Sequence, residues 1–308
     1  MTADLRVRPD APPIEAALAE SPRRRASLAT LGGWAFVAPS LAVIAGFTLY
    51  PIVLSLIDSF TGSGGKWSLE QFAAMRDDEI LHKVFRNNLV FAVVTVPISI
   101  VLALTMALWV NGKIRGRGFM RLAFFTPTIL PMVAAASIWL YFYTPGYGPV
   151  DTLMHALGLP GHNWLGDPRT ALGSIMVVTI WKEAGFFMIF YLAGLQNMPP
   201  ELEEASLLEG ASPWYHFRRV TFPLLMPTTL FVVVVAVTTS FKQVEHIFVM
   251  TRGGPDNASS LLLFYIYKVA FTFYDQHYAA ILTLVLVLTL LLLAFLQFRF
   301  LERRTHYQ

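Results

Sequence analysis

The sequence contains no cysteine, and charged residues make up only 14% of its 308 residues. The absence of cysteine excludes disulfides, thiol catalysis and cysteine-ligated metal sites. A soluble domain normally carries about 25% charged residues, whereas 55% of this chain is hydrophobic and its mean hydropathy is +0.55. One soluble core could not bury so much apolar surface, so the composition predicts a protein that lies in lipid.

The positive charge of the chain is scattered rather than gathered into one basic surface. The net charge of +3 comes from short clusters of Lys and Arg beside apolar runs, which is typical of membrane topology and not of nucleic-acid binding. The polar residues 1–30 precede an apolar run that is longer than the core of a cleaved signal peptide. We therefore expect an N-terminal cytoplasmic tail at 1–30, a retained first span, and lipid but no nucleic acid as a partner.

Six apolar stretches are long enough to cross a bilayer, which takes about 20 residues. Because lipid cannot satisfy an open backbone, separate spans must be helical, and we predict an all-α membrane domain over residues 31–308. The only charged residues inside these stretches are Lys182 and Glu183, in the fourth. The expected spans are 31–57, 87–111, 122–143, 171–195, 222–241 and 278–298.

The basic residues also predict an orientation. With the N-terminus inside, the inner segments hold 14 of the 23 Lys and Arg residues, the excess that cytoplasmic segments carry. Both termini and residues 199–220 are then expected inside, with residues 144–170 and 243–275 outside. Pro127 and Pro131 should kink the third span; such kinks either shape the bundle only or open a central cavity.

The connection at residues 198–223 is predicted to form two short helices. A pair of prolines starts the first, and Gly210 ends it because glycine tolerates a positive φ. Ser212 and Pro213 fit the N-cap and the first position of the second helix. The apolar Leu207 and Leu208 would be exposed there, which indicates a docking partner, although an ordinary amphipathic loop is the alternative.

This connection resembles the coupling motif of ABC importer permeases, in which Glu-Ala-Ala, three residues and Gly are followed after nine residues by Ile-x-Leu-Pro. The matching positions are Glu204, Ala205, Ser206, Gly210, Val220, Phe222 and Pro223. Ser206, Val220 and Phe222 replace the usual Ala, Ile and Leu. The resemblance implies a cytoplasmic coupling helix that docks on an ATPase. The residues it assigns to coupling are Glu204, Ala205, Ser206, Leu208, Glu209, Gly210 and Ala211.

Further segments resemble the carbohydrate-type permeases of maltose-like and glycerol-3-phosphate importers. They are Trp181-Lys182, residues 192–196, Pro199, residues 251–255, and residues 297–300 with 307–308. The resemblance implies a type I permease, not itself an enzyme, in the bacterial inner membrane, for an oligosaccharide, a glycoside or glycerol-3-phosphate. It also implies a second homologous permease, two ATPase subunits that hold ATP and Mg²⁺, and a periplasmic or lipid-anchored solute-binding protein. No cofactor is expected in this chain.

The substrate path is predicted from polar and aromatic residues in or beside the spans. Ionisable groups inside a span are costly and indicate function, so Lys182 and Glu183 are candidates; a structural link to a neighbouring helix is the alternative. An anionic solute would favour Lys182 and Lys242. Aromatic residues could stack on a sugar, although in spans they more often pack. The remaining candidates are Phe187, Tyr191, Ser240, Gln243 and Glu245, and no spacing of residues indicates a metal site.

Residues 146–169 are long enough to dock a binding protein, but a solvated loop without a partner is the alternative.

Two rival functions are those of a secondary transporter and of an intramembrane enzyme. A secondary transporter also uses a helical bundle, yet it needs an intramembrane acid, for which only Glu183 is available, and it leaves residues 198–223 unexplained. An intramembrane enzyme lacks paired catalytic groups within the spans.

Overall fold

A computed structural model describes residues 22–61, 67–112 and 115–302. Within this part, the side chains of residues 22–32, 70–71, 203–205, 207 and 300–302 are not described. The chain divides between Ile57 and Asp58 into two units.

The described part of the first unit is one continuous helix. α2 (Pro22–Ile44) passes through a π-helical turn, η1 (Ala45–Leu49), into α3 (Tyr50–Ser59). Its apolar stretch Gly33–Ser59 is long enough to cross a bilayer, in agreement with the first predicted span. The helix begins at Pro22, inside the segment predicted as a tail, and residues 1–21 of that tail lie outside the described residues.

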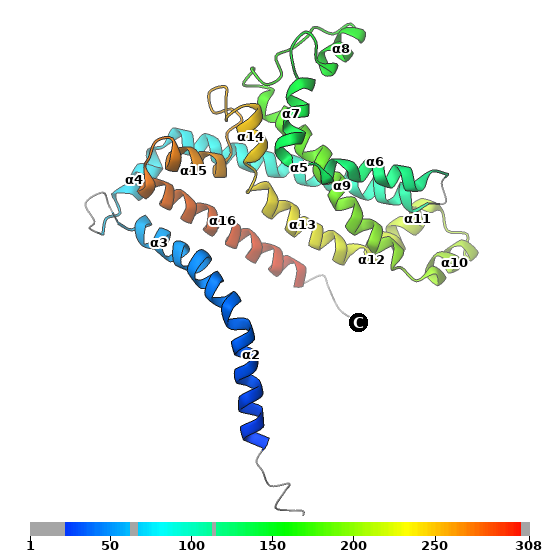
Figure 1. Ribbon diagram of the computed structural model, residues 1–308. Coiled ribbons are helices and arrows are strands. Elements are labelled where there is room, and N and C mark those ends of the chain that lie inside the picture. Colours follow the sequence, from blue (N-terminus) through cyan, green and yellow to red (C-terminus); the bar gives the residue numbers. More distant parts are fainter. Residues whose placement is uncertain (1–21, 62–66, 113–114, 303–308) are drawn as a thin grey trace, which may run out of the picture. The chain divides into compact units, whose positions relative to one another are not determined.

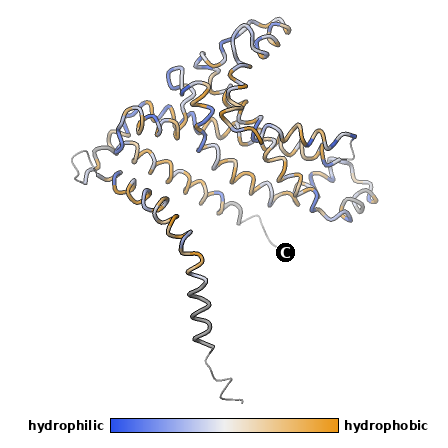
Figure 2. Tube along the Cα trace, viewed as in Figure 1, coloured by the Kyte–Doolittle hydropathy of each residue, from blue (hydrophilic) through white to orange (hydrophobic). Residues whose placement is uncertain are grey.

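The described part of the second unit contains four further helices that are long and apolar enough to span a membrane on their own or with their continuation (Figure 1). They are α5 (Glu79–Asn111), α9 (Ala171–Gln196), α13 (Met226–Ser240) and α16 (Gln276–Glu302). Hydrophobic residues dominate all four (Figure 2). α5 and α9 make the most extensive helix contact of this unit, and α13 packs against both. One buried cluster lies between these three helices, and another lies between α5, α16 and residues 262–270.

Shorter helices connect the long ones. They are α4 (Glu70–Asp77), α6 (Arg117–Ile129), α7 (Met132–Phe142), α8 (Pro149–Ala156), α10 (Pro200–Leu208), α11 (Pro213–His216), α12 (Phe222–Leu224), α14 (Glu245–Met250) and α15 (Leu262–Phe271), with a second π-helical turn, η2 (Phe217–Thr221). No strand is found among the described residues.

The third predicted span is not one continuous helix. α6 and α7 meet at an angle of 101°, a much sharper break than the kink expected from the sequence. Leu130, which joins them, has φ −67° and ψ 133°, because a residue before proline is driven out of the helical region. Counting this bent pair as one span gives six spans in the described chain, as predicted.

The fifth span runs past its predicted end at Phe241. The chain leaves the helix after Ser240, turns through residues 241–244 and continues as α14, so that the candidate span is Met226–Met250. Gln243 and Glu245, predicted to lie beyond the end of the span, lie instead at a break inside the apolar segment.

Candidate functional site

Lys182 lies near the middle of α9, and its ammonium group contacts the end of α6. Nζ donates hydrogen bonds to the carbonyls of Pro127 at 3.0 Å and Thr128 at 3.2 Å, and also to the carbonyl of Leu130. In return, Thr128 Oγ1 donates to the carbonyl of Lys182 at 3.3 Å. The carbonyls of a helix's last turn lack partners inside the helix, and Lys182 supplies those partners.

Glu183, the next residue, contacts the break in the fifth span. Its Oε1 accepts a hydrogen bond from Nε2 of Gln243 at 2.8 Å, while its Oε2 is buried and has no hydrogen-bond partner among the described residues. One turn earlier on α9, Oγ1 of Thr179 lies 3.1 Å from Nε2 of His246, in the first turn of α14. The central turn of α9 therefore contacts the breaks in both the third and the fifth span.

A cavity lies between α6, α7, α9 and α13 and is here called the α9 cavity. Its volume is about 240 Å³. Apolar walls with a few convergent polar groups are the usual composition of a site for a small polar solute. The lining residues are Thr128, Met132, Lys182, Glu183, Phe186, Phe187, Thr239 and Gln243.

Four of the predicted substrate candidates line this cavity and four do not. Those that line it are Lys182, Glu183, Phe187 and Gln243. Tyr191 is fully buried in the core between α5, α9 and α13. Ser240 is buried, and its hydroxyl donates to the carbonyl of Val237 at 2.7 Å. Lys242 and Glu245 are exposed and lie outside the lining of this cavity.

Sequence reasoning misses the hydroxyl groups of the cavity. Thr128 lies between the two prolines of the third span, and Thr239 lies just before the break in the fifth. A threonine inside an apolar run is a weak signal, because its hydroxyl can bond to its own helix. Only the packing of the helices brings these two residues to one cavity.

Residues 198–223, here called the coupling segment, form the predicted pair of helices. α10 begins at Pro200, and Gly210 has a φ of +71°. Ser212 is the N-cap of α11, with its hydroxyl accepting a hydrogen bond from the amide of Tyr215 at 3.3 Å. Oγ of Ser206 lies 2.7 Å from Nδ1 of His216 and joins the two helices.

The tip of the coupling segment is an exposed surface. Leu208 is 89% exposed, Glu209 and Gly210 are also exposed, and Ala211 is half-buried. An exposed large apolar side chain of this kind indicates a contact with a partner. The side chains of two further predicted coupling residues, Glu204 and Ala205, lie outside the described residues.

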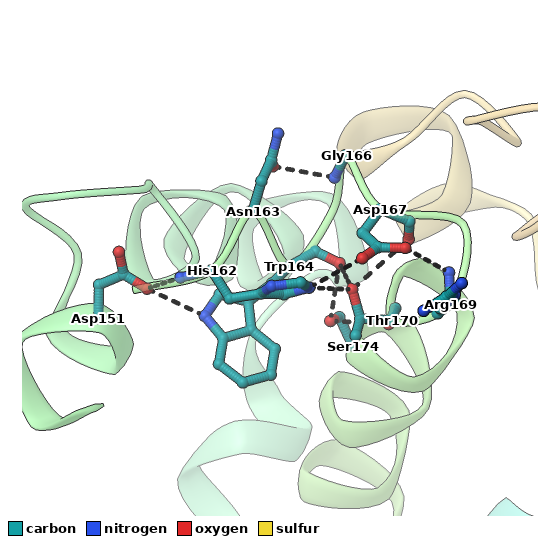
Figure 3. A network of polar contacts seen from close by, with 9 residues as sticks. All are labelled: Asp151, His162, Asn163, Trp164, Gly166, Asp167, Arg169, Thr170 and Ser174. Atoms are coloured by element: carbon teal, nitrogen blue, oxygen red, sulfur yellow. Dashed lines mark hydrogen bonds and ion pairs between the residues drawn. The ribbon is translucent and has the colours of Figure 1, made fainter. Parts of the chain in front are cut away.

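Residues 146–169 form an ordered loop around a buried carboxylate (Figure 3). Asp151 accepts hydrogen bonds from the amide of Gly146 at 2.8 Å, the amide of His162 at 3.1 Å and Nε1 of Trp164 at 3.1 Å. The bonds from the two backbone amides hold the pKa of the Asp151 carboxyl below its ordinary value. The hydroxyl of Thr170 donates to the carbonyl of Trp164 at 2.8 Å, which fastens the loop to the start of α9.

Residues 89–307 match the family described as the binding-protein-dependent transport system inner membrane component. The chain belongs to this family. It is 34% identical over 278 residues to the lactose transport system permease protein LacF of Rhizobium radiobacter, covering 87% of this chain and 93% of that protein.

Other relatives agree with this membership. The chain is 30% identical over 281 residues to the sn-glycerol-3-phosphate transport system permease protein UgpA of Yersinia enterocolitica, covering 88% of this chain and 94% of the relative. Its fold is similar to that of a chain in a bacterial ABC transporter involved in the import of the acidic polysaccharide alginate. The TM-score is 0.81 at 20% identity, with 93% of this chain and 100% of that chain covered.

Membership of this family confirms the prediction of an ABC importer permease with a helical type I fold. The chain is a transport subunit and a multi-pass membrane protein. A second structure with a similar fold, at a TM-score of 0.78, is the alginate transporter in complex with an alginate pentasaccharide-bound periplasmic protein. The family description itself is of a transport system that depends on a binding protein.

Proposed function

We propose that this chain and a second permease form the translocation path for a sugar or a sugar-like solute, such as an oligosaccharide, a glycoside or glycerol-3-phosphate. The relatives named for lactose, for starch degradation products and for glycerol-3-phosphate support this solute class. The α9 cavity, with its hydroxyl, carboxylate and amide groups beside Phe187, is the part of the path that contacts the solute.

The coupling segment docks on one of two ATPase subunits, which bind ATP and Mg²⁺. The observation that carries this proposal is the exposed Leu208 at the tip of a helix pair whose turn and cap follow the family's coupling motif. Closure of the ATPases on ATP binding would move the coupling segment and bias a bundle that has two arrangements. The proposed coupling residues are Glu204, Ala205, Ser206, Leu208, Glu209, Gly210 and Ala211.

The chain is oriented with both termini in the cytoplasm. The excess of Lys and Arg in the segments that this orientation places inside supports it. Residues 146–169 are then outside, where the loop ordered by Asp151 offers a fixed surface to a periplasmic or lipid-anchored solute-binding protein.

Two substitutions in the coupling segment test this function. Leu208→Asp places a charge on the docking surface, and Gly210→Pro is incompatible with a φ of +71°. Both variants should insert into the membrane normally, yet lower ATP-driven uptake in proteoliposomes by at least about tenfold, the equivalent of about 1.4 kcal/mol of lost docking free energy.

A matched control is Leu157→Asp, which charges another exposed leucine, 64% exposed, on the opposite side in the proposed topology. This variant should keep the ATPase subunits bound during purification, whereas the two coupling variants should lose them. Wild-type uptake by Leu208→Asp, or uptake by a complex without ATPase subunits, would show that the proposal is wrong. The second result would instead support the secondary transporter, which the ABC permease relatives do not favour.

A further inference from the structure

The ammonium group of Lys182 has no donor left for a solute. A lysine ammonium carries three N–H donors and no acceptor. The carbonyls of Pro127, Thr128 and Leu130 occupy three donors. A transported anion could bind Lys182 only by displacing one of these carbonyls.

These carbonyls need their partner because of where the helix is broken. In an uninterrupted helix, the carbonyl of Pro127 would accept from the amide of residue 131, but Pro131 has no amide hydrogen. Lipid offers no replacement donor, and an unsatisfied backbone group in the hydrocarbon region is costly. The 101° bend between α6 and α7 is therefore stable only while another residue donates to its open end.

Lys182 and Thr128 make this contact reciprocal. The lysine ammonium donates to the Thr128 carbonyl at 3.2 Å, and the Thr128 hydroxyl donates to the Lys182 carbonyl at 3.3 Å. Both residues line the α9 cavity, as does Met132 at the start of α7. The position of the bend thus decides the width of the cavity between α7 and α9.

We infer that Lys182 is a positioning residue, which holds the bend between α6 and α7 and thereby shapes the α9 cavity, and that it does not bind the solute by its charge. This inference rests on the proposed function, since it concerns the same path. Among the described residues that line the cavity, Lys182 is the only cation, and its three donors are already occupied by backbone carbonyls. The solute that fits is therefore a neutral polyhydroxy compound rather than glycerol-3-phosphate.

Three substitutions at Lys182 separate positioning from charge recognition. Lys182→Arg keeps both the charge and the N–H donors, Lys182→Gln keeps donors but loses the charge, and Lys182→Met loses both. A positioning role predicts that Arg and Gln are tolerated and Met is not. A solute-binding cation predicts that Gln and Met are equally damaging.

The bend can be measured with a pair of spin labels, because the chain has no cysteine of its own. Phe119 on α6 and Tyr141 on α7 are 75% and 60% exposed, so labelled cysteines at both positions report the distance across the bend. The full chain in lipid nanodiscs should give a narrow distance distribution. Lys182→Arg and Lys182→Gln should keep it, whereas Lys182→Met should broaden it.

The second readout is ATP hydrolysis stimulated by the binding protein in the assembled complex. Lys182→Gln should keep at least about half of the wild-type rate of ATP hydrolysis. Lys182→Met should lower this rate about tenfold. A tenfold loss corresponds to about 1.4 kcal/mol, close to the contribution of one hydrogen bond to a charged group. If Lys182→Met fails to assemble with its partners, its distance distribution is still measured on the chain alone, and Thr128→Val, which keeps the carbonyls that the ammonium contacts, should leave that distribution narrow.

The inference is overturned if Lys182→Met leaves the distances unchanged, or if Lys182→Gln is as damaging as Lys182→Met in both readouts. Failure of the proposed function would look different. In that case the ATPase subunits would not bind, while the distances measured on the chain alone would still respond to Lys182→Met.

Discussion

Gly185 is the position where a single methyl group should do most damage to the packing around the cavity. A Cβ atom at Gly185 would lie 2.2 Å from the carbonyl oxygen of Phe124 on α6 and 3.2 Å from Oγ1 of Thr128. Small residues at such crossings let membrane helices approach closely. Gly185→Ala therefore forces α6 away from α9 by about 1 Å to reach an ordinary van der Waals distance.

The expected cost of Gly185→Ala follows from that movement. Overpacking of a tight contact costs about 1–3 kcal/mol. A shift of about 1 Å would also stretch the bonds from Lys182 to Pro127 and Thr128, now 3.0 and 3.2 Å, beyond a normal hydrogen-bond length, at about 1 kcal/mol each. Replacing a helical glycine by alanine returns about 0.5–1 kcal/mol. We expect a net loss of about 2–4 kcal/mol in the free energy of unfolding.

Gly173, on the same helix, provides the matched control. A Cβ atom there meets no other atom within 4 Å, so Gly173→Ala should be neutral or stabilise the protein by up to about 1 kcal/mol. Both variants can be compared by reversible unfolding in mixed detergent micelles, followed by circular dichroism. Equal stability of the two variants would refute the reasoning, because it would mean that α6 does not approach α9 as closely as described.

Two further predictions concern the segments outside the bundle core. Gly210→Ala should weaken binding of the ATPase subunits about fivefold, because a positive φ costs an L-residue about 1 kcal/mol, and Gly210→Asn should weaken this binding less. Pull-down titrations measure the affinity of both variants. Equal affinities for the wild type and Gly210→Ala would contradict this prediction. Asp151, whose pKa is lowered by bonds from the amides of Gly146 and His162, should stabilise the 146–169 loop fully above the ordinary carboxyl pKa and lose this contribution below about pH 4. The fluorescence of Trp164, obtained as the difference between the wild type and Trp164→Phe, should change with pH as the 146–169 loop loosens. Asp151→Asn should abolish this pH dependence. A pH transition that persists in Asp151→Asn would show that another group is responsible.

Much of the fold follows from signals that act over a few residues. The lengths of the apolar stretches predict the number of spans, because the thickness of a bilayer requires about 20 residues of helix. The coupling segment is predicted down to single positions, since Pro200, Gly210 and Ser212 influence only their own turn of backbone. The family resemblance rests on the same local spacing and is confirmed by the match over residues 89–307.

The candidate site depends on contacts between distant parts of the chain, which no local pattern specifies. The sequence indicates that Lys182 and Glu183 are functional, but it leaves open whether they bind a solute or join helices. Only the packing of α9 against α6 brings the Lys182 ammonium to carbonyls more than 50 residues away. Likewise, Gln243 reaches Glu183 only because the fifth span breaks beside α9.

The amino-acid sequence by itself therefore determined that this chain is a helical membrane permease with a capped pair of short helices at residues 198–223, because hydrophobic length, caps and motif spacing are properties of neighbouring residues. The tertiary structure decided the 101° bend, the α9 cavity and the partners of Lys182. The physical reason is that buried polar groups in lipid must find their hydrogen bonds within the protein, and the helix that supplies them is chosen by packing.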